Sequence, residues 1–547
     1  MKELIFGLIG GTALLMYGVD KMGDGLEKAS GAMMRKILSV LTGKVWSAFL
    51  VGTFLTALVQ SSTAITVLTV GFVNAGLMKL PQAIGIIYGA NIGTTITAQL
   101  MAFSFQFKLT DLALPVLGIG FAMGLVCKNK TAKNFADAIM GFGMMFLGLR
   151  ILNSGVPFMQ SDPTLRSFFL NYASIPLVAI FLGIIATAAV HSSAATVGLV
   201  MVLGQAGLLE LPSAICIMFG DNIGTCVTAQ LASVQGNIHA RRTAWAHTLY
   251  NVIGVLMAWI LLPWFTDLIV LATNYFQPGG GIEAQIANSH TFFNVFSAVV
   301  FLPLTKHYVK FLETVIQGKS EESEVEPIYT DRLLLDTPVA AMKATVAETA
   351  RAAGIARRMF DGVMQGFYRN DLARLEKAER NEEILNDLQK QITQYIIELS
   401  KRPLGHMESQ MVPTLISGIN NVERIGDHSL SLSRLAHEKM EKNLVFSDEA
   451  LHDLQEIQTI IFSMFELTID ALETGDRETI SRVKEMESRM DDLSKEVQEG
   501  HAQRLEDGKC SVEPGLIFLD VVNYLERIAD HIYKVCVALG ELIAHTK

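Results

Sequence analysis

Apolar positions divide the chain into two unlike parts. Residues 1–312 contain long apolar runs with few charges, which is typical of segments that cross a lipid bilayer. From about residue 337 onward, apolar positions recur at helical spacing among many charges, which indicates amphipathic helices in water. The pattern therefore predicts an all-α chain, with a polytopic membrane part followed by a soluble helical part.

The apolar runs of the first part come in two lengths. A helix needs about 20 residues to span the membrane, and four of the apolar runs are shorter than this. They form two pairs, 45–60 with 63–78 and 174–191 with 193–208, and each pair is joined at a short polar segment. Non-helical backbone survives at that depth only where it is buried in protein or faces a wet cavity. We therefore expect two re-entrant helical hairpins whose tips lie inside the membrane.

Other apolar runs predict further helices, with an interfacial helix over 20–44. The predicted membrane segments are 4–19, 80–101, 111–127, 210–231, 243–264 and 289–312, the last of them an extra helix after the repeats.

The two hairpins belong to an internal repeat. At a constant offset of 131 residues, Gly52–Leu100 matches Gly183–Leu231 with 25 identities in 49 aligned positions and no gap. The whole repeats cover about 4–127 and 137–264. The chain is therefore expected to contain two copies of one membrane unit.

Lysine and arginine positions predict the orientation of these units. If Lys128, Lys130 and Lys133 lie inside, few cations remain in the outside loops. The N-terminus is then outside, the soluble part is cytoplasmic, and an odd number of crossings separates equivalent points of the two repeats. Inverted repeats with broken helices and a site near the membrane midplane are typical of secondary transporters.

The hairpin tips and a second polar cluster offer groups that bind a solute. A helix that starts at a tip directs its N-terminus there, and helix N-termini attract anions. Hydroxyls donate to an oxyanion, and they also ligate a hard cation such as Na⁺. We expect Gly89, Gly93, Gly220 and Gly224 to let the neighbouring helix unwind beside the tips. The candidate substrate-binding and ion-binding residues are Gln60, Ser61, Ser62, Thr63, Asn91, Thr94, Thr95, His191, Ser192, Ser193, Asp221, Asn222 and Thr225.

Each of these motifs has a structural alternative. Membrane helices rich in Ser, Thr and Gly commonly mark helix packing. Asp221 is either a cation or coupling site, as intramembrane acids usually are, or an acid at a loop end. His191, the counterpart of Gln60, is either protonatable or a neutral hydrogen-bonding group. His247 and His290 each precede an Asn by four residues, which favours interhelical hydrogen bonding over ligand contact.

The soluble part is itself a repeat. After a linker over 314–336, Asn420–His428 matches Asn523–His531 at an offset of 103, which predicts two three-helix bundles. The six predicted helices are 337–369, 371–402, 406–440, 448–475, 477–507 and 512–545. Acid pairs at i, i+4 lie on single helix faces, either as solvated faces or as carboxylate ligands of a metal cluster. These acids are Glu379, Glu383, Glu423, Asp427, Glu487, Asp491, Glu526 and Asp530.

Charge and cysteine usage narrow the function classes. Residues 1–312 carry 17 Lys and Arg against 11 Asp and Glu, and the rest carry 27 against 43, so no nucleic-acid partner is expected. The five cysteines lack metal-ligand spacing, which predicts isolated thiols. The N-terminal run lacks a signal-cleavage pattern and is interpreted as a membrane helix. Neither a Walker loop nor a nucleophile–base set is present in the sequence, so we expect no enzyme.

Two pairs of motifs resemble known families. The tip sequences at 60–63 and 191–194, with Gly-Ala-Asn-Ile-Gly-Thr at 89–94 and Gly-Asp-Asn-Ile-Gly-Thr at 220–225, resemble the bacterial type II sodium–phosphate cotransporters. The paired Glu-Arg-Ile-x-Asp-His motifs are similar to PhoU proteins, six-helix phosphate-signalling proteins that bind metal clusters through Glu-x-x-x-Asp motifs. Together the two resemblances cover nearly the whole chain.

The resemblance implies Na⁺-coupled transport of inorganic phosphate across the cytoplasmic membrane, with Na⁺ as co-substrate. It implies a transport domain over 1–313 and a cytoplasmic PhoU-like domain over 337–547, with a transition-metal cluster as a candidate cofactor. Phosphate and Na⁺ are expected near the tip hydroxyls. Besides the lipid bilayer, a second copy of the chain or a regulatory protein is a candidate partner.

The tips depart from the family pattern at two positions, and other functions stay open. His191 stands where the family usually has Gln, and Ala194 stands where a hydroxyl is common.

The first alternative function is a phosphate exporter or a carrier of another oxyanion. The second is a membrane-anchored, phosphate-responsive regulator whose transport site is vestigial.

Overall fold

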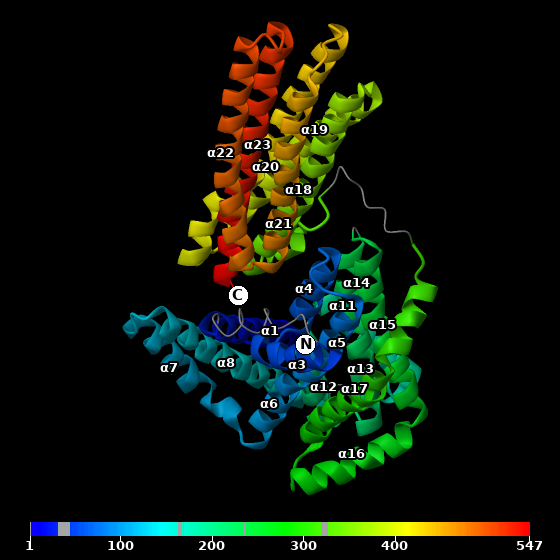
Figure 1. The fold of residues 1–547 in the computed structure, drawn as a ribbon. Coiled ribbons are helices and arrows are strands. Elements are labelled where there is room, and N and C mark those ends of the chain that lie inside the picture. The colour runs from blue at the N-terminus through cyan, green and yellow to red at the C-terminus, as the bar shows by residue number, and fades with distance from the viewer. Residues whose placement is uncertain are drawn as a thin grey trace. The chain divides into compact units, whose positions relative to one another are not determined.

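The computed structural model describes residues 2–30, 44–161, 163, 167, 169–234, 236–318 and 327–546. Within these residues all regular structure is helical, as Figure 1 shows, which confirms the all-α prediction for this part of the chain. The chain divides into two compact units, unit 1 over Met1–Ser320 and unit 2 over Glu321–Lys547.

Unit 1 contains a tight pair of long helices. Helix α1 (Lys2–Ala29) packs along α8 (Lys130–Ser154). A Cβ built on Gly18 would overlap the backbone of Met145, so the glycine permits this close approach. The prediction of an interfacial helix that starts at residue 20 is wrong, because α1 continues to Ala29 without a break. The rest of that predicted helix, 31–43, lies outside the described residues.

The two repeats fold into the same series of short helices. The first repeat contains α3 (Val45–Val59), α4 (Ser62–Asn74), α5 (Leu80–Gly93) and α6 (Thr95–Gln106). The second repeat contains α11 (Pro176–Val190), α12 (Ser193–Gln205), α13 (Leu211–Gly224) and α14 (Cys226–Ser233). The helix breaks predicted within each short pair are confirmed, between α3 and α4 and between α11 and α12.

The prediction that glycines unwind the helices beside the tips is wrong for Gly89 and Gly220, whereas α5 ends at Gly93 and α13 ends at Gly224. Gly89 and Gly220 lie inside the regular helices α5 and α13. A Cβ on Gly89 would overlap the carbonyl oxygen of Phe49, and a Cβ on Gly220 would overlap that of Ile180. The glycines are therefore required because α5 packs directly against α3, and α13 against α11.

The two repeats pack against each other through α4 and α12, the second helices of the two short pairs. Helix α4 contacts α14 and α15 (Ile238–Ile260), whereas α12 contacts α6 and α17 (Ile282–Val315). Helices α6 and α14 follow the Asn-Ile-Gly-Thr motifs of the first and second repeats. Helix α4 of the first repeat thus packs on α14 of the second, and α12 of the second repeat packs on α6 of the first. Equivalent contacts on both sides bring polar groups of the two repeats into one region.

Several helices of unit 1 have the length and composition of membrane spans. Among the described residues, four segments are long and apolar enough to cross a membrane: Leu109–Val126, Lys130–Phe158, Leu211–Ser233 and Ile282–Val315. A fifth span arises if α15 and the next helix, α16 (Leu262–Phe276), count as one broken span, since an 87° bend separates them. Helix α16 was not predicted. The four helices α3, α4, α11 and α12 are shorter than a span, as expected.

The remaining elements of unit 1 are short or connect the repeats. They are η1 (Leu109–Leu112), α7 (Ala113–Val126), α9 (Val156–Ser161) and the π-helix η2 (Phe169–Ala173).

Unit 2 contains the six predicted soluble helices, whose ends differ from the prediction by at most two residues. They are α18 (Pro338–Arg369), α19 (Leu372–Ser400), α20 (His406–Glu441), α21 (Asp448–Thr474), α22 (Arg477–Glu506) and α23 (Val512–Thr546). The three helices of each triplet contact one another, and the contacts α20–α23 and α18–α21 join the triplets. Every helix therefore contacts at least two others, which buries its apolar face.

A buried carboxylate fixes the segment before α18. Glu348 is fully buried, and it accepts hydrogen bonds from the backbone N–H groups of Ile328 (2.7 Å) and Tyr329 (2.6 Å). Arg351 neutralises it at 2.5 Å. The hydroxyl of Tyr395 also donates to the carbonyl of Asp331. The last part of the predicted linker over 314–336 is therefore attached to unit 2, while 319–326 lie outside the described residues.

Substituting Gly220→Ala tests the close packing of α11 and α13. The added methyl group must displace backbone, so we expect a loss of about 3 kcal/mol or more, or no folded protein at all. Gly118→Ala in α7 is the matched control, because nothing lies within 4 Å of its Cβ position. Thermal unfolding and the monodisperse yield in detergent measure the effect. A Gly220→Ala protein as stable as Gly118→Ala would contradict this close packing.

Candidate functional site

The tip of the first hairpin is a helix break made by a single residue. Gln60 ends α3 in the left-handed region, with φ 59° and ψ 20°, and its N–H donates to Thr56 O at 2.7 Å. A non-glycine residue in this region is uncommon and signals a local constraint. Ser61 then caps α4, because its side chain accepts a hydrogen bond from the Ala64 N–H.

The second tip has the same backbone geometry. His191 ends α11 with φ 56° and ψ 24°, and its N–H donates to Thr187 O at 2.7 Å. Ser192 caps α12 by accepting from the Ala195 N–H at 3.3 Å. Both second halves therefore begin at a serine-capped tip, which confirms the predicted helix starts at the two tips.

A threonine contacts the tip residue in each repeat. Gln60 Oε1 accepts a hydrogen bond from the hydroxyl of Thr97 at 2.5 Å, and His191 Nδ1 lies 3.4 Å from the hydroxyl of Thr228. Gln60 is buried, whereas His191 is exposed. The sequence interpretation did not name Thr97 and Thr228, although both recur at the offset of 131.

The tip hydroxyls differ in their accessibility. Ser62 is buried, whereas Ser61, Thr63, Ser192 and Ser193 are each partly exposed. Four hydroxyl-bearing residues at two equivalent helix starts are therefore only partly buried. Each lies at the start of a helix, where several N–H groups have no partner inside the helix.

An acid distinguishes the second repeat from the first. Asp221 is fully buried in α13, and its Oδ1 lies 2.7 Å from Thr187 Oγ1, which is 2.9 Å from Thr196 Oγ1. Asp221 Oδ2 has no hydrogen-bond partner among the described residues. In the first repeat, Ala90 and Ile65 stand at the positions of Asp221 and Thr196. This oxygen-rich cluster is thus built in one repeat only.

The two Asn-Ile-Gly-Thr motifs do not make equal contacts, although their sequences match. Asn91 Nδ2 donates to Asn251 Oδ1 at 3.1 Å, and His247 Nε2 lies 3.4 Å from Asn91 Oδ1. The predicted interhelical bonding of His247 and Asn251 is thereby confirmed. Asn222 instead donates to Met218 O of its own helix at 2.9 Å.

The contacts of the second His–Asn pair, His290 with Asn294, and of the threonines in the two motifs differ from those expected. Among the described residues both ring nitrogens of the buried His290 lack a partner, so the interhelical bond predicted for this pair is not found. Asn294 Nδ2 donates to His290 O of its own helix. Thr95 and Thr225 donate to carbonyls of Ile92 and Asn222, and Thr94 is buried.

The acids of unit 2 approach one another without forming a ligand set. Burial, together with Asp427 and Glu382, raises the pKa of Glu423. Burial, Asp491 and Asp530 raise the pKa of Glu487 in the same way. In the described part of the chain, however, no three His, Cys, Asp or Glu side chains gather as a metal site needs.

The contacts of individual acids differ from those that the predicted metal ligands would need. Glu382, which lies between the predicted Glu379 and Glu383, is the acid of α19 whose charge acts on Glu423. Asp530 instead pairs with Lys534 at 2.7 Å. A metal role of these acids stays a prediction.

Comparison with known proteins divides the chain in the same two parts. Residues 14–154 and 159–265 match the Na⁺/Pi-cotransporter family. Residues 349–436 and 454–539 match the PhoU domain, once for each helix triplet.

Individual relatives agree with these matches. The protein YjbB of Escherichia coli, which is provisionally named an inorganic phosphate export protein, is 27% identical over 530 residues, or 95% of this chain and 94% of YjbB. The uncharacterized protein YqeW of Bacillus subtilis is 30% identical over 316 residues, which cover 57% of this chain and 99% of YqeW. The rat sodium-dependent phosphate transport protein 2A is 33% identical over 107 residues, or 19% of this chain and 17% of that protein.

These matches and the apolar helices of unit 1 lead to one assignment. The chain is a multi-pass membrane protein that belongs to the Na⁺/Pi-cotransporter family, a family of transporters rather than enzymes, and it carries a C-terminal PhoU region.

Proposed function

We propose that the chain is a Na⁺-coupled carrier of inorganic phosphate that works by alternating access. The observation that carries the proposal is the repeated helix break, with left-handed Gln60 and His191 followed by the capping serines Ser61 and Ser192. In this proposal the two helix pairs are re-entrant hairpins of inverted repeats, and phosphate binds between their tips near the membrane midplane.

The tips have the physical properties that an oxyanion site needs. The N-termini of α4 and α12 carry partial positive charge and free N–H donors. The hydroxyls of the partly exposed residues Ser61 and Ser192 add donors without a fixed charge. A site of this kind can bind an anion and release it again, whereas a buried Lys or Arg would hold it more firmly. Na⁺ would lower the cost of holding a doubly charged anion at low dielectric, which couples the two solutes.

The cluster around Asp221 supports a Na⁺ site in the second repeat. Asp221 supplies a carboxylate oxygen that has no partner among the described residues, and Thr187 supplies a hydroxyl 2.7 Å from the other oxygen. Oxygen ligands of this type suit a hard cation, and an acid within a membrane domain is rarely kept without a function. Because Ala90 replaces the acid in the first repeat, the two halves are not interchangeable.

The remaining parts of the chain are assigned roles in the same proposal. Residues 1–313 form the transport domain of a cell-membrane protein with its N-terminus outside. Residues 314–336 are the linker, and 337–547 form a cytoplasmic PhoU-like domain that regulates the carrier. Positively charged segments of residues 1–312 support this orientation, because they fall on the side assigned to the cytoplasm.

Phosphate export is the second candidate function. The name of YjbB, whose similarity covers nearly the whole of both chains, favours it. The same site serves either direction, because gradients decide the net flux of a secondary carrier. A membrane-anchored regulator with a vestigial transport site is disfavoured by the two intact, serine-capped tips.

The double substitution Ser61→Ala with Ser192→Ala tests the phosphate site. Each lost hydroxyl removes a hydrogen bond to a charged ligand worth about 1.5–3 kcal/mol, so we expect phosphate flux to fall about 100-fold. Radiolabelled phosphate uptake into proteoliposomes measures it. The matched control is Ser47→Ala with Ser154→Ala, since these exposed hydroxyls bond only to local carbonyls. Normal uptake by the folded double variant would show that the tips serve packing alone.

Replacing Asp221 with Asn tests the cation site separately. The amide keeps the size of the side chain and removes its charge, so the Na⁺ concentration for half-maximal flux should rise at least about 10-fold, as the loss of one charged ligand contact predicts. The control is Asp267→Asn, which removes an exposed acid of α16. Flux is measured over a series of Na⁺ concentrations at constant ionic strength. An unchanged Na⁺ dependence in Asp221→Asn would exclude this carboxylate as a Na⁺ ligand.

A further inference from the structure

Helices α15 and α17 occupy equivalent places beside the two repeats. They share the sequence His-Thr-x-x-Asn, at 247–251 and 290–294, at an offset of 43. Helix α15 contacts α4, α5 and α14, and α17 contacts α12, α13 and α6, which are the counterparts of those helices at the offset of 131. The two helices therefore present the same motif to equivalent helices of the two repeats.

A hydrogen bond to each motif follows this symmetry. Gln230 Nε2 of α14 donates to Thr248 Oγ1 of α15 at 2.7 Å. The equivalent bond joins Gln99 Nε2 of α6 to Thr291 Oγ1 of α17 at 2.9 Å. In both cases a glutamine from the helix after the Asn-Ile-Gly-Thr motif bonds to the threonine of a His-Thr-x-x-Asn motif.

A pair of packed aromatic rings supports the same relation. Tyr88 of α5 and Tyr250 of α15 have ring centroids 4.6 Å apart. Their counterparts, Phe219 of α13 and Phe293 of α17, have ring centroids 4.9 Å apart. The contact of α5 with α15 is thus equivalent to the contact of α13 with α17, and the remaining side chains of the two contacts can be compared pair by pair.

A hydrogen-bonded network joins α5 to α15. Asn91 Nδ2 donates to Asn251 Oδ1 at 3.1 Å, and His247 Nε2 lies 3.4 Å from Asn91 Oδ1. Asn251 Nδ2 also donates to His247 O, one turn earlier in α15, at 3.2 Å. All three side chains are buried. The amide of Asn91 is therefore held by two side chains of α15.

The equivalent network between α13 and α17 is not formed among the described residues. Asn222 Nδ2 donates instead to Met218 O of its own helix at 2.9 Å. Asn294 keeps the local bond from its Nδ2 to His290 O, but its Oδ1 has no partner. Both ring nitrogens of His290 also lack a partner. The unpaired groups are those whose counterparts in α15 bind Asn91.

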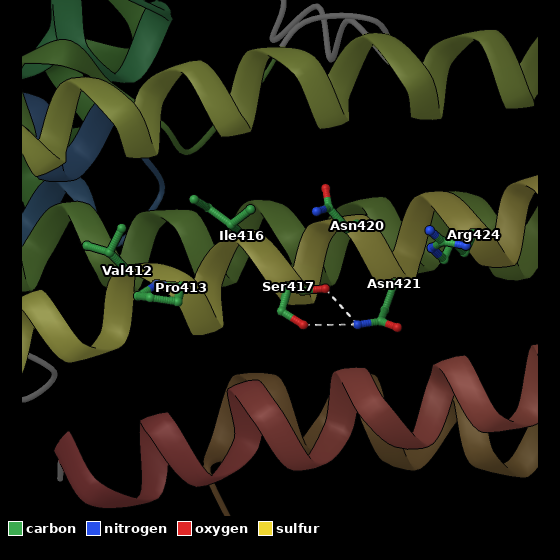
Figure 2. A pocket seen from close by; sticks show the side chains of 7 residues that line it. All are labelled: Val412, Pro413, Ile416, Ser417, Asn420, Asn421 and Arg424. Atoms are coloured by element: carbon green, nitrogen blue, oxygen red, sulfur yellow. Dashed lines mark hydrogen bonds between the residues drawn. The ribbon is translucent and has the colours of Figure 1, made fainter.

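Burial makes these unpaired groups costly. His290 and Asn294 are at most 2% exposed, and a buried polar group without a partner has given up its hydrogen bonds to water. Asn421, in a groove of α20, donates to Ser417 one turn earlier, as Figure 2 shows, and its Oδ1 lies 2.8 Å from His531 Nδ1. Asn294 has the same local bond but lacks the second contact.

We propose that His290 and Asn294 are positioning residues that bind Asn222 in the other conformation of the carrier. In that conformation the Asn222 amide turns from Met218 O to Asn294 Oδ1, and Asn91 releases α15. The inference rests on the proposed alternating access, in which repeats of inverted topology exchange their conformations when the site opens to the opposite side.

The exchange keeps the number of hydrogen bonds nearly constant. One network breaks as its counterpart forms, so each network stabilises one of the two conformations. The two conformations then have similar free energies, which a carrier needs if it is to populate both of them. Removing an acceptor from one network should therefore shift the populations toward the conformation that the other network stabilises.

Sided thiol labelling of the full-length protein in membrane vesicles tests the proposal. Ser193→Cys places a reporter thiol at the partly exposed second tip, and Cys127→Ser with Cys510→Ser removes the partly exposed native thiols. The other three cysteines are buried and remain. A membrane-impermeant maleimide is applied to right-side-out and inside-out vesicles in buffer without Na⁺ and phosphate. The ratio of the two labelling rates reports the populations in which the tip faces each side.

The two networks predict opposite shifts of this ratio. Asn251→Leu removes an acceptor of the formed network, and Asn294→Leu removes the acceptor of the unformed one. We expect the ratio to change about tenfold in opposite directions, as the loss of one buried hydrogen bond predicts, and to return near its original value when both substitutions are combined. Asn153→Leu, at an exposed position of α8, is the control and should leave the ratio unchanged.

Asn294→Leu gives the sharper test. Because Asn294 Oδ1 has no partner among the described residues, a purely structural role predicts an unchanged ratio for this variant. The variant therefore tests the proposal even if Asn251→Leu does not fold. An unchanged ratio in Asn294→Leu, or shifts of both variants in the same direction, would overturn the proposal.

The labelling result is separate from the proposed transport activity, because it needs neither Na⁺ nor phosphate. Opposite shifts in a protein without phosphate flux would support the exchange and contradict the proposed substrate. Phosphate flux together with an unchanged ratio in Asn294→Leu would contradict the exchange and leave the proposed carrier standing.

Discussion

A helix broken inside an apolar environment must satisfy its own backbone, and unit 1 is built around this constraint. The N–H groups of Gln60 and His191 bond back to Thr56 and Thr187, and the capping serines each occupy one N–H of the next helix. A cap satisfies only part of the four orphan donors of a helix start. In the proposed carrier, the donors that remain and the serine hydroxyls at the helix break are the groups that bind the anion.

The packing around the tips follows from the same constraint. Short helices of 13 to 15 residues expose two ends each, and they need close neighbours that exclude lipid from those ends. Glycines at 89 and 220 allow α5 and α13 to approach the first halves at backbone distance. The second halves pack against the opposite repeat, whereas the side chains of Gln60 and His191 contact Thr97 and Thr228 of their own repeats. Asp221 then adds a charge on one side only of this nearly symmetric frame.

Much of this arrangement follows from the sequence because run length and repetition are strong signals. The positions of both helix breaks could be predicted because the apolar runs on either side are too short to cross the membrane. The internal repeats at offsets of 131 and 103 identified which residues are equivalent in the two halves of each unit. Features decided by tertiary packing were not predicted. The glycines of α5 and α13 resemble flexible positions in sequence, yet they serve close contact. Helix α16 follows an 87° bend after a nearly continuous apolar run, and periodicity does not record such a bend.

Side-chain contacts between helices were also beyond sequence patterns. Thr97 and Thr228 contact the tips from helices that look largely apolar, and nothing in their spacing marks them as tip contacts. The charge of Glu382, rather than that of the predicted Glu379 or Glu383, raises the pKa of Glu423. The packing of α19 decides which of its acids face α20, and the sequence pattern does not show this.

The central claim is that Na⁺ and phosphate share the region between the two tips, and phosphate flux in proteoliposomes tests it most directly. Purified protein is reconstituted, and radiolabelled phosphate movement is followed with a Na⁺ gradient, with a K⁺ gradient of the same size, and with no gradient. The account predicts that phosphate accumulates against its own gradient only when Na⁺ flows with it, in whichever direction the Na⁺ gradient is imposed. Phosphate movement at equal rates under all three conditions, or no movement under any of them, would contradict it.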